Sequence, residues 1–215
     1  LRITLVSPAS HTPYSGMLPG LVAGHYSFEQ THIDLARLCQ WAGVRFIAAQ
    51  VTALDPCARR LSLAGRPDME YDLVSIDIGS QPELDSVPGA REFSVPVKPV
   101  AGLWQRWQDL LERLAVLPSG KRRRIAVVGG GAGSVELALA MAHHLAQRPV
   151  DLELWCGAPE ILQGYNPGAR RATMAALARH RVAVSVDARV ERVEAGRLLL
   201  ADGREAAYDE LFWCT

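Results

Sequence analysis

The chain has 215 residues, of which 49% are hydrophobic and 21% are charged, and it is long enough to form one large α/β domain or two small ones. Basic and acidic side chains number 23 each, so the net charge is zero and the sequence lacks the electrostatic footprint of a general nucleic-acid binder. No apolar run approaches the ~20 residues that a helix needs to span a bilayer.

The first elements in chain order predict one α/β unit. It opens on an apolar strand, continues with a helix and a second strand, and ends with a polar hairpin around a glycine and a third strand that a Tyr-Asp pair begins. These elements are expected at Arg2–Val6, Ile33–Trp41, Val44–Ala48, Val51–Gly65 and Tyr71–Ile76.

An insertion after the first strand contains Tyr14–Gly24. Its glycines and prolines predict a shaped loop rather than a periodic element. Loops at the carboxyl ends of parallel strands are where α/β sheets bind ligands, so we expect Tyr14 and its neighbours to line a site. A purely structural loop is the alternative.

The order of elements repeats downstream, after a Trp-rich amphipathic helix within Val95–Leu117. The second copy has an additional strand, glycine turn and helix at its start, in Ile125–Gln147. Its remaining elements are expected at Leu152–Cys156, Arg170–Arg179, Val182–Val186, Val190–Gly203 and Tyr208–Trp213.

The repeat predicts an α/β fold of two Rossmann-like dinucleotide-binding units, of which the first is truncated. By comparison with the second copy, the first lacks its opening strand, glycine turn and helix, roughly 30 residues. The chain opens at Leu1 and stops at Thr215 flush with predicted strands, so we expect a piece of a longer protein. We place the boundary near Pro118, between domains at 1–118 and 119–215.

The glycine turn at Gly129–Ser134 fits the pattern G-x-G-x-x-[G/A/S] between an aliphatic strand and a helix. Gly129 permits the tight turn, Gly131 lets the backbone approach a pyrophosphate, and the small Ser134 allows the helix to pack closely. Gly133 belongs to the same turn. Free amides at the helix N-terminus would face the phosphates.

The ribose ligand of such a unit is an acidic residue that ends the second strand, ~20 residues after the turn. That place falls on Cys156, flanked by Trp155 and Gly157, with neither an acid nor an arginine. We therefore expect only a modest preference between NADH and NADPH. Glu136 follows in the helix, where capping and a place near the nicotinamide edge are equal alternatives.

The four cysteines are dispersed and include no CxxC pair. Such spacing indicates buried, inert thiols in a reducing cytoplasm, and no metal site is predicted. Peripheral association with the inner face of a membrane stays open as an alternative location.

These patterns resemble the pyridine nucleotide–disulfide oxidoreductase superfamily, in its type II NADH dehydrogenase-like branch. The likeness rests on Tyr14–Gly24, Tyr71–Ser80, Lys98-Pro99 and Gly129–Glu136, and it is strongest to flavoprotein modules found alone or fused ahead of selenophosphate synthetase. In that superfamily an NAD(P)H domain is inserted into a flavin domain, which matches the repeat.

The resemblance implies roles for further residues. Ser7-Pro8 would lie at the FAD ribose, Val51 would meet the adenine through its backbone, and Gly79-Ser80 would match the small turn near FAD. Lys98 would be a further cofactor-binding residue, with a solvated linker lysine as the alternative. Ser7 stands where the family usually has an acid, and Asp77 where it has a small or apolar residue. The family's redox cysteine pair is missing.

We therefore expect an enzyme in which NAD(P)H delivers a hydride to FAD, and the reduced flavin passes electrons to a small acceptor such as a quinone. A non-catalytic dinucleotide-binding module, which senses redox state or scaffolds a partner, is the alternative. The expected partners are that acceptor, a selenophosphate synthetase domain and a second copy of the chain. Without the first glycine turn, we expect the 215 residues not to retain FAD.

Overall fold

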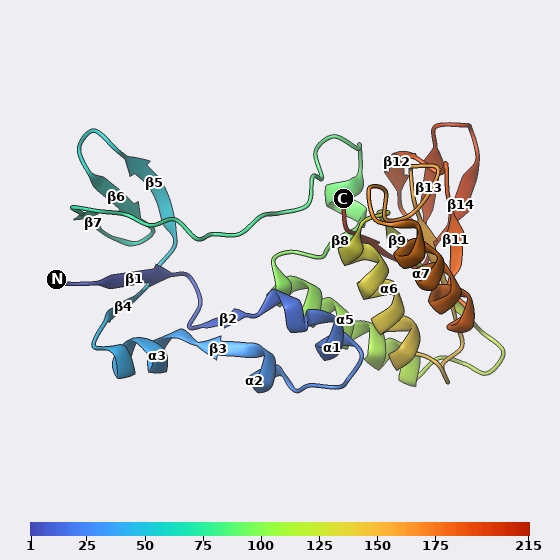
Figure 1. Ribbon diagram of the computed structural model, residues 1–215, viewed down its shortest axis with the longest axis horizontal. Coiled ribbons are helices and arrows are strands. Elements are labelled where there is room, and N and C mark those ends of the chain that lie inside the picture. The colour runs from blue at the N-terminus through green and yellow to red at the C-terminus, as the bar shows by residue number, and fades with distance from the viewer. The chain divides into compact units, whose positions relative to one another are not determined.

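The computed structural model describes residues 1–215 and divides them into two compact units (Figure 1). Unit 1 comprises Leu1–Tyr14 and Ser27–Gly79. Unit 2 comprises Ser15–Tyr26 and Ser80–Thr215. The short segment Ser15–Tyr26 therefore leaves unit 1 in the middle of its sequence and packs as part of unit 2.

Unit 1 is built from short strands and two short helices. Its elements are β1 (Thr4–Ser7), β2 (His11–Pro13), α2 (Phe28–Thr31), β3 (His32–Asp34), α3 (Leu35–Ala42), β4 (Arg45–Ala48), β5 (Val51–Asp55), β6 (Arg60–Leu63) and β7 (Arg66–Glu70). β1 pairs with β4 in parallel, β2 pairs with β3 antiparallel, and β5–β6–β7 form an antiparallel sheet.

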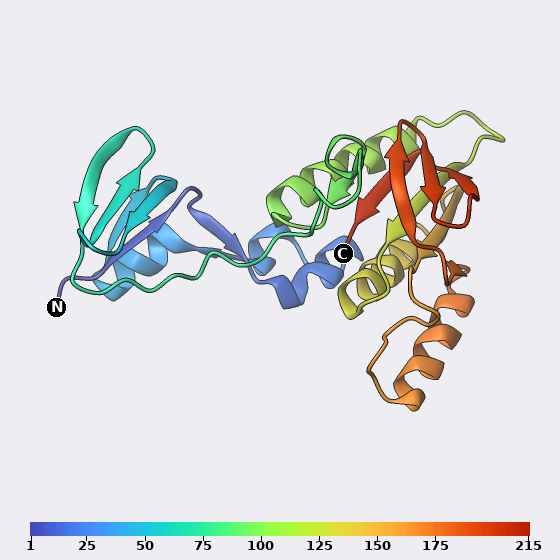
Figure 2. The ribbon, with the colours of Figure 1, turned by 90° about the horizontal axis from the view of Figure 1, so that it is seen from above.

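Local signals fix α3 between the two parallel strands. Asp34 caps its first turn, because the carboxylate accepts a hydrogen bond from the amide of Arg37 at 3.0 Å. Gly43 ends the helix in the left-handed region at φ +66°. Figure 2 shows α3 on one side of the β1–β4 pair and the β5–β7 strands on the other. A small core that includes Ile47 and Leu61 lies between β4 and β6.

Unit 2 contains a five-stranded parallel sheet, a second sheet and the longer helices. Its elements are η1 (Ser15–Met17), α1 (Leu18–Val22), α4 (Ala90–Phe93), β8 (Val95–Pro96), α5 (Val100–Ala115), β9 (Arg123–Val128), α6 (Ala132–His144), β10 (Val150–Trp155), α7 (Pro167–Arg179), β11 (Ala183–Ser185), β12 (Val190–Glu194), β13 (Arg197–Leu200), β14 (Glu205–Ala207) and β15 (Glu210–Trp213).

The parallel sheet has the order β11-β10-β9-β15-β8, with β9 at its centre. Residues Ile125–Val128 of β9 are all buried, as expected of a parallel strand covered on both faces. Ile125 and Val127 point into a core shared with α5, α6 and α7, while Ala126 and Val128 point into a second core shared with β12–β14. The predicted α/β fold with a parallel sheet is thereby confirmed.

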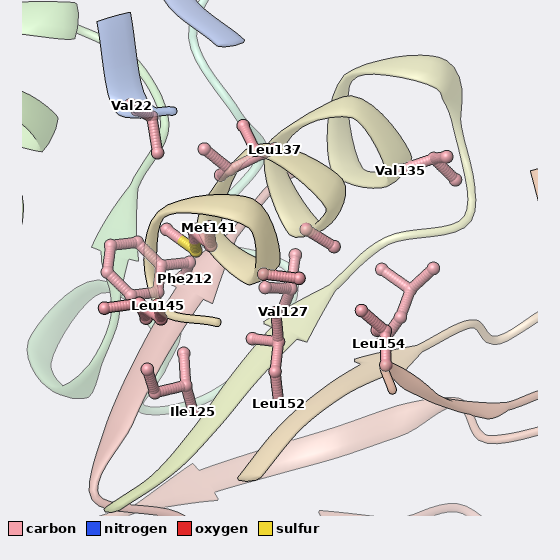
Figure 3. Packing of buried hydrophobic residues seen from close by; sticks show 14 of the residues in the cluster. Val22, Ile125, Val127, Val135, Leu137, Met141, Leu145, Leu152, Leu154 and Phe212 are labelled. Atoms are coloured by element: carbon pink, nitrogen blue, oxygen red, sulfur yellow. The ribbon is translucent and has the colours of Figure 1, made fainter. Parts of the chain in front are cut away.

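The segment Ser15–Tyr26 is partly helical, which corrects the prediction of a non-periodic loop at Tyr14–Gly24. Its α1 packs against α6, and Val22 is completely buried beside Leu137 (Figure 3). Periodicity failed here because five residues give little more than one helical turn, and Pro19 and Gly20 suggested a turn instead.

The two copies of the predicted repeat are both recognisable. In unit 1 the parallel pair β1–β4 is followed along the chain by the antiparallel sheet β5–β7. In unit 2 the parallel pair β10–β11 is followed in the same way by the antiparallel sheet β12–β14. The strand predicted at Tyr71–Ile76 is wrong, because these residues pair with no other strand. Its counterpart β15 pairs with β9, and unit 1 contains no counterpart of β9.

Two further boundaries differ from the sequence expectation. The helix expected at Ile33–Trp41 begins at Leu35, because Ile33 pairs with Thr12 in the β2–β3 ladder. β8 and α5 pack in unit 2, so the compact units do not divide at Pro118. The assignment of 1–118 to FAD and 119–215 to NAD(P) stays a prediction. None of the helices combines the length and the hydropathy required for a membrane crossing.

Candidate functional site

The glycine turn joins the carboxyl end of β9 to the start of α6, as predicted. Gly129 has φ +139°, a conformation that side chains other than glycine rarely adopt. A Cβ at this position would also approach the Cβ of Cys214 and the side chain of Ser134 to 3.2 Å. Gly129 therefore serves both the turn and the close packing of α6 on the sheet.

Gly130 is required for a reason that the pattern did not indicate. A Cβ here would lie 2.3 Å from Sγ of Cys156, which is 1% exposed at the end of β10. The thiol donates a weak hydrogen bond to the carbonyl of Glu160 at 3.6 Å. Cys156 thus fills the space under the turn.

Gly131 and Gly133 face open space, since a Cβ on either would meet no atom within 4 Å. The first backbone hydrogen bond of α6 is donated by the amide of Val135 to the carbonyl of Gly131 at 3.2 Å. The amides of Ala132, Gly133 and Ser134 precede it and have no acceptor in the helix. These donors and the bare Cα of Gly131 form a place where an anionic group can approach the backbone.

A cavity of about 430 Å³ opens at this turn, within the usual range of ligand sites of about 300–1,000 Å³. It lies at the carboxyl ends of β9, β10 and β15, where open α/β sheets bind ligands. Its wall is mainly apolar or small, and comprises Ser86, Val87, Val128–Gly131, Trp155–Ala158, Glu160, Gln163, Ala188–Val190, Trp213 and Thr215.

Two predicted residues of the turn do not line this cavity with their side chains. Ser134 is 1% exposed, and its hydroxyl donates to the carbonyl of Gly131 at 2.8 Å, so it ties the helix to the turn. Glu136 lies in the second turn of α6, which has no acid in its first turn. The capping role therefore does not apply. Its exposed side chain lines no part of the cavity, and a place near the nicotinamide edge stays a prediction.

The cavity wall near Cys156 contains two charged residues: Glu160, which from the sequence lies beyond the expected ligand position, and Arg189, which sequence reasoning missed. Glu160 follows β10 and forms an ion pair with Arg170 of α7. Arg189 precedes β12 and belongs to the segment that lies against Gly157. The internal repeat was a usable signal, because it aligns Val190 with Val51, the residue expected at an adenine, and Arg189 adjoins Val190.

The residues predicted to contact FAD fall into different parts of the chain. Ser7 ends β1 in unit 1, and its hydroxyl donates to the carbonyl of Ala9 at 2.9 Å across the exposed Pro8. Val51 begins β5 and is 41% exposed. Tyr14 is 60% exposed. These residues are available to a ligand of unit 1.

Lys98 and Ser80 are brought together in unit 2, although 17 residues separate them in the sequence. The ammonium of Lys98 donates to the hydroxyl of Ser80 at 3.1 Å. Gly79, which precedes Ser80, is in the left-handed region at φ +71°. The resemblance gave Lys98 and Ser80 as separate cofactor-binding candidates, and their roles stay predictions.

All four cysteines are free thiols. Burial raises the pKa of the Cys214 thiol to about 12, so this thiol is neutral at physiological pH. Cys156 and Cys214 follow β10 and β15, which flank β9 on opposite sides. Two strand spacings place them ~10 Å apart, beyond the ~7 Å that a disulfide bridges.

Comparison with known proteins places this geometry in a family. The model of the family described as pyridine nucleotide-disulphide oxidoreductase matches residues 1–215. The chain is 26% identical over 196 residues to the Arabidopsis thaliana protein named alternative NAD(P)H-ubiquinone oxidoreductase C1, covering 84% of this chain and 37% of that protein. It is 27% identical over 153 residues to the demethylphylloquinone reductase NdbB of Synechocystis sp., covering 68% and 37%.

Solved structures share the fold at lower identity. NDH2 from Plasmodium falciparum in complex with NADH has a TM-score of 0.88 at 16% identity, covering 100% of this chain and 50% of that one. The sulfide:quinone oxidoreductase of Aquifex aeolicus has a TM-score of 0.78 at 20% identity, covering 99% and 52%. The chain spans about half the length of these structures, and less than half of the two curated relatives.

Proposed function

Because this chain belongs to the pyridine nucleotide-disulphide oxidoreductase family, we propose that it is part of a flavin-dependent NAD(P)H oxidoreductase, and that unit 2 binds the nicotinamide dinucleotide. FAD and NAD(P)H are the cofactors of this family, as the sequence predicted. The observation that carries the proposal is the cavity at Gly129–Gly131, at the start of α6.

The residues at this cavity fit a dinucleotide. Gly131 presents a bare backbone to open space, so a pyrophosphate can reach the free amides of Ala132 and Gly133. Trp155 and Trp213 line the cavity beside the turn and keep water from part of its wall. The chain thereby binds and orients the dinucleotide.

In unit 1 we assign the flavin contacts to the carboxyl end of β1 and the start of β5. Ser7 and Pro8 stand where the ribose would lie, and the backbone of Val51 would meet the adenine. Within unit 2, Lys98 donates to Ser80 at 3.1 Å, and both stay candidate cofactor-binding residues of that unit. When bound, the flavin would accept a hydride from the nicotinamide and pass electrons to the acceptor.

We propose a small molecule, such as a quinone, as that acceptor. The names of the two curated relatives, a ubiquinone oxidoreductase and a demethylphylloquinone reductase, favour this class. The distance between Cys156 and Cys214 is inconsistent with a redox disulfide at their strands. A cytoplasmic location, a selenophosphate synthetase domain and a homodimer stay predictions.

Dinucleotide binding tests the placement of the site. Titration of the 215-residue chain with NADH and NADPH should show binding, and Gly131→Val should abolish it, because a branched side chain would occupy the pyrophosphate approach. Gly102→Val is the matched control, since Gly102 lies in α5 and also meets no atom within 4 Å. Unchanged affinity in Gly131→Val would show that the site lies elsewhere.

Turnover tests the reaction. The intact protein, supplied with FAD, should oxidise NAD(P)H in the presence of a quinone analogue, and its absorbance spectrum should show a bound flavin. Binding of NAD(P)H without turnover would instead support the non-catalytic redox-sensing module.

A further inference from the structure

The residues at the end of β10, where a dinucleotide-binding unit contacts the adenosine ribose, carry no charged side chain. In dinucleotide-binding units the residue that ends the second strand reads the 2′ position of the adenosine ribose. Here that strand ends at Trp155 and is followed by Cys156 and Gly157. The Cys156 side chain is buried under the turn and Gly157 has none, so neither can read the 2′ group.

Only two charged side chains line the cavity, and one of them is already paired. The carboxylate of Glu160 forms an ion pair with Arg170. Its negative charge is therefore compensated within the protein, with Oε1 held by Arg170. Arg189 forms no ion pair and no side-chain hydrogen bond. Its guanidinium is the uncompensated charge of the cavity wall.

Backbone contacts hold Arg189 beside the end of β10. A Cβ on Gly157 would lie 3.3 Å from the Cα of Arg189 and 3.4 Å from its Cβ, so the two main chains are adjacent. The preceding amide, of Ala188, donates to the carbonyl of Cys156 at 2.9 Å. The carbonyl of Arg189 accepts from the amide of Ala201 at 2.9 Å. The main chain of Arg189 is thus held next to Cys156 and Gly157, which follow the strand whose end reads the 2′ group in such units.

We propose that Arg189 recognises the 2′-phosphate of NADPH and that this chain prefers NADPH to NADH. A guanidinium presents a planar fork of donors that matches a phosphate, whereas the 2′-hydroxyl of NADH is usually held by a free carboxylate. The proposal rests on the proposed dinucleotide function of unit 2. It replaces the expectation of a modest preference, which considered only the residues that end the second strand.

Equilibrium titration of the 215-residue chain separates the two proposals. NADPH should bind at least about tenfold more tightly than NADH, and adenosine 2′,5′-bisphosphate should compete better than 5′-AMP. Arg189→Gln should weaken NADPH binding about 10- to 100-fold and leave NADH binding unchanged. Arg189→Lys should restore part of the loss, since it keeps the charge without the fork.

Arg192→Gln is the matched control, because Arg192 is an exposed arginine of β12 that does not line the cavity. It should leave both affinities unchanged. Equal affinities for NADPH and NADH, or an equal loss of both in Arg189→Gln, would overturn the assignment of Arg189 while unit 2 remains a dinucleotide site. Failure of the unsubstituted chain to bind either dinucleotide would overturn the proposed function and this inference together.

Discussion

At the scale of single residues, Gly130 is constrained by a partner 26 positions away in the sequence. Its missing side chain leaves room for Sγ of Cys156, which would lie 2.3 Å from a Cβ at this position. The G-x-G pattern leaves the middle position free, so the pattern alone gives no reason for a glycine there. Packing beneath the turn supplies the reason.

A double-variant cycle tests this packing. Gly130→Ala should destabilise the chain by about 1–3 kcal/mol, the usual cost of overpacking. Cys156→Ala should rescue most of that loss, because the Cβ of residue 156 would still lie at an acceptable 3.4 Å. Denaturant unfolding of the two single variants and the double variant measures the coupling. Additive losses would contradict the contact.

The four cysteines should differ sharply in reactivity. Cys57 is exposed, whereas Cys39 and Cys156 are buried and the pKa of Cys214 is raised to about 12 by burial. A raised pKa keeps the thiol protonated until the pH approaches that value, so Cys214 carries almost no reactive thiolate at about pH 8. Maleimide labelling followed by mass spectrometry should modify Cys57 alone, and Cys57→Ser should abolish labelling. Modification of Cys214 at a comparable rate would contradict its raised pKa.

None of the four cysteines should be required for turnover, whether or not it can be labelled. Serine at any of the four positions should leave turnover of the intact protein in place, with some loss of stability at the buried sites.

At the scale of elements, two buried tryptophans provide a matched pair. Trp107 of α5 is fully buried, and its Nε1 has no hydrogen-bond partner. Trp213 of β15 is 2% exposed, but its Nε1 donates to the carbonyl of Glu83 at 2.9 Å. The sequence predicted α5 as a Trp-rich amphipathic helix, and Trp107 lies on its buried face. The unpaired donor could only be found in the fold.

Phenylalanine substitution should therefore have different costs at the two positions. Trp107→Phe removes an unsatisfied donor along with some ring volume, so its net effect on stability should stay within about 1 kcal/mol. Trp213→Phe leaves the Glu83 carbonyl unpaired and should cost about 1–3 kcal/mol more. Thermal unfolding of both variants measures the difference. Equal losses would show that the hydrogen bond of Trp213 contributes nothing net.

Elements were predictable from the sequence where local signals and packing agree. β9, α6 and β10 were anticipated because apolar strands flank a glycine turn, and α5 because its apolar face repeats at helical spacing. Tyr71–Ile76 has the alternation of a strand but lacks a partner strand, so no ladder forms. α1 depends on its contact with α6, which the local sequence does not encode.

The candidate site divides in the same way. Gly129, Gly131 and Cys156 were predicted because they occupy fixed positions relative to one strand–turn–helix. Arg189 and the Glu160–Arg170 pair line or border the cavity through tertiary contacts between β10, α7 and the segment before β12. Sequence spacing from the glycine turn does not reach them.

At the scale of the whole molecule, the chain contains separate hydrophobic cores. The core of unit 1 has four buried residues, Ile47, Ala49, Leu61 and Leu63. Unit 2 contains two larger cores, one on each face of its parallel sheet. Because buried apolar area dominates folding stability, unit 1 should be the weaker of the two.

Hydrogen exchange and denaturant unfolding should therefore resolve two transitions, with the amides of β4 and β6 exchanging before those of β9 and β10. The segment Ser15–Tyr26 should exchange with unit 2, although unit 1 surrounds it in sequence, because Val22 is buried in the core of unit 2. Ile47→Ala should shift the first transition and Leu154→Ala the second, each by about 2–5 kcal/mol in its own unit. One common transition, moved equally by both substitutions, would show that the two units unfold as one cooperative structure.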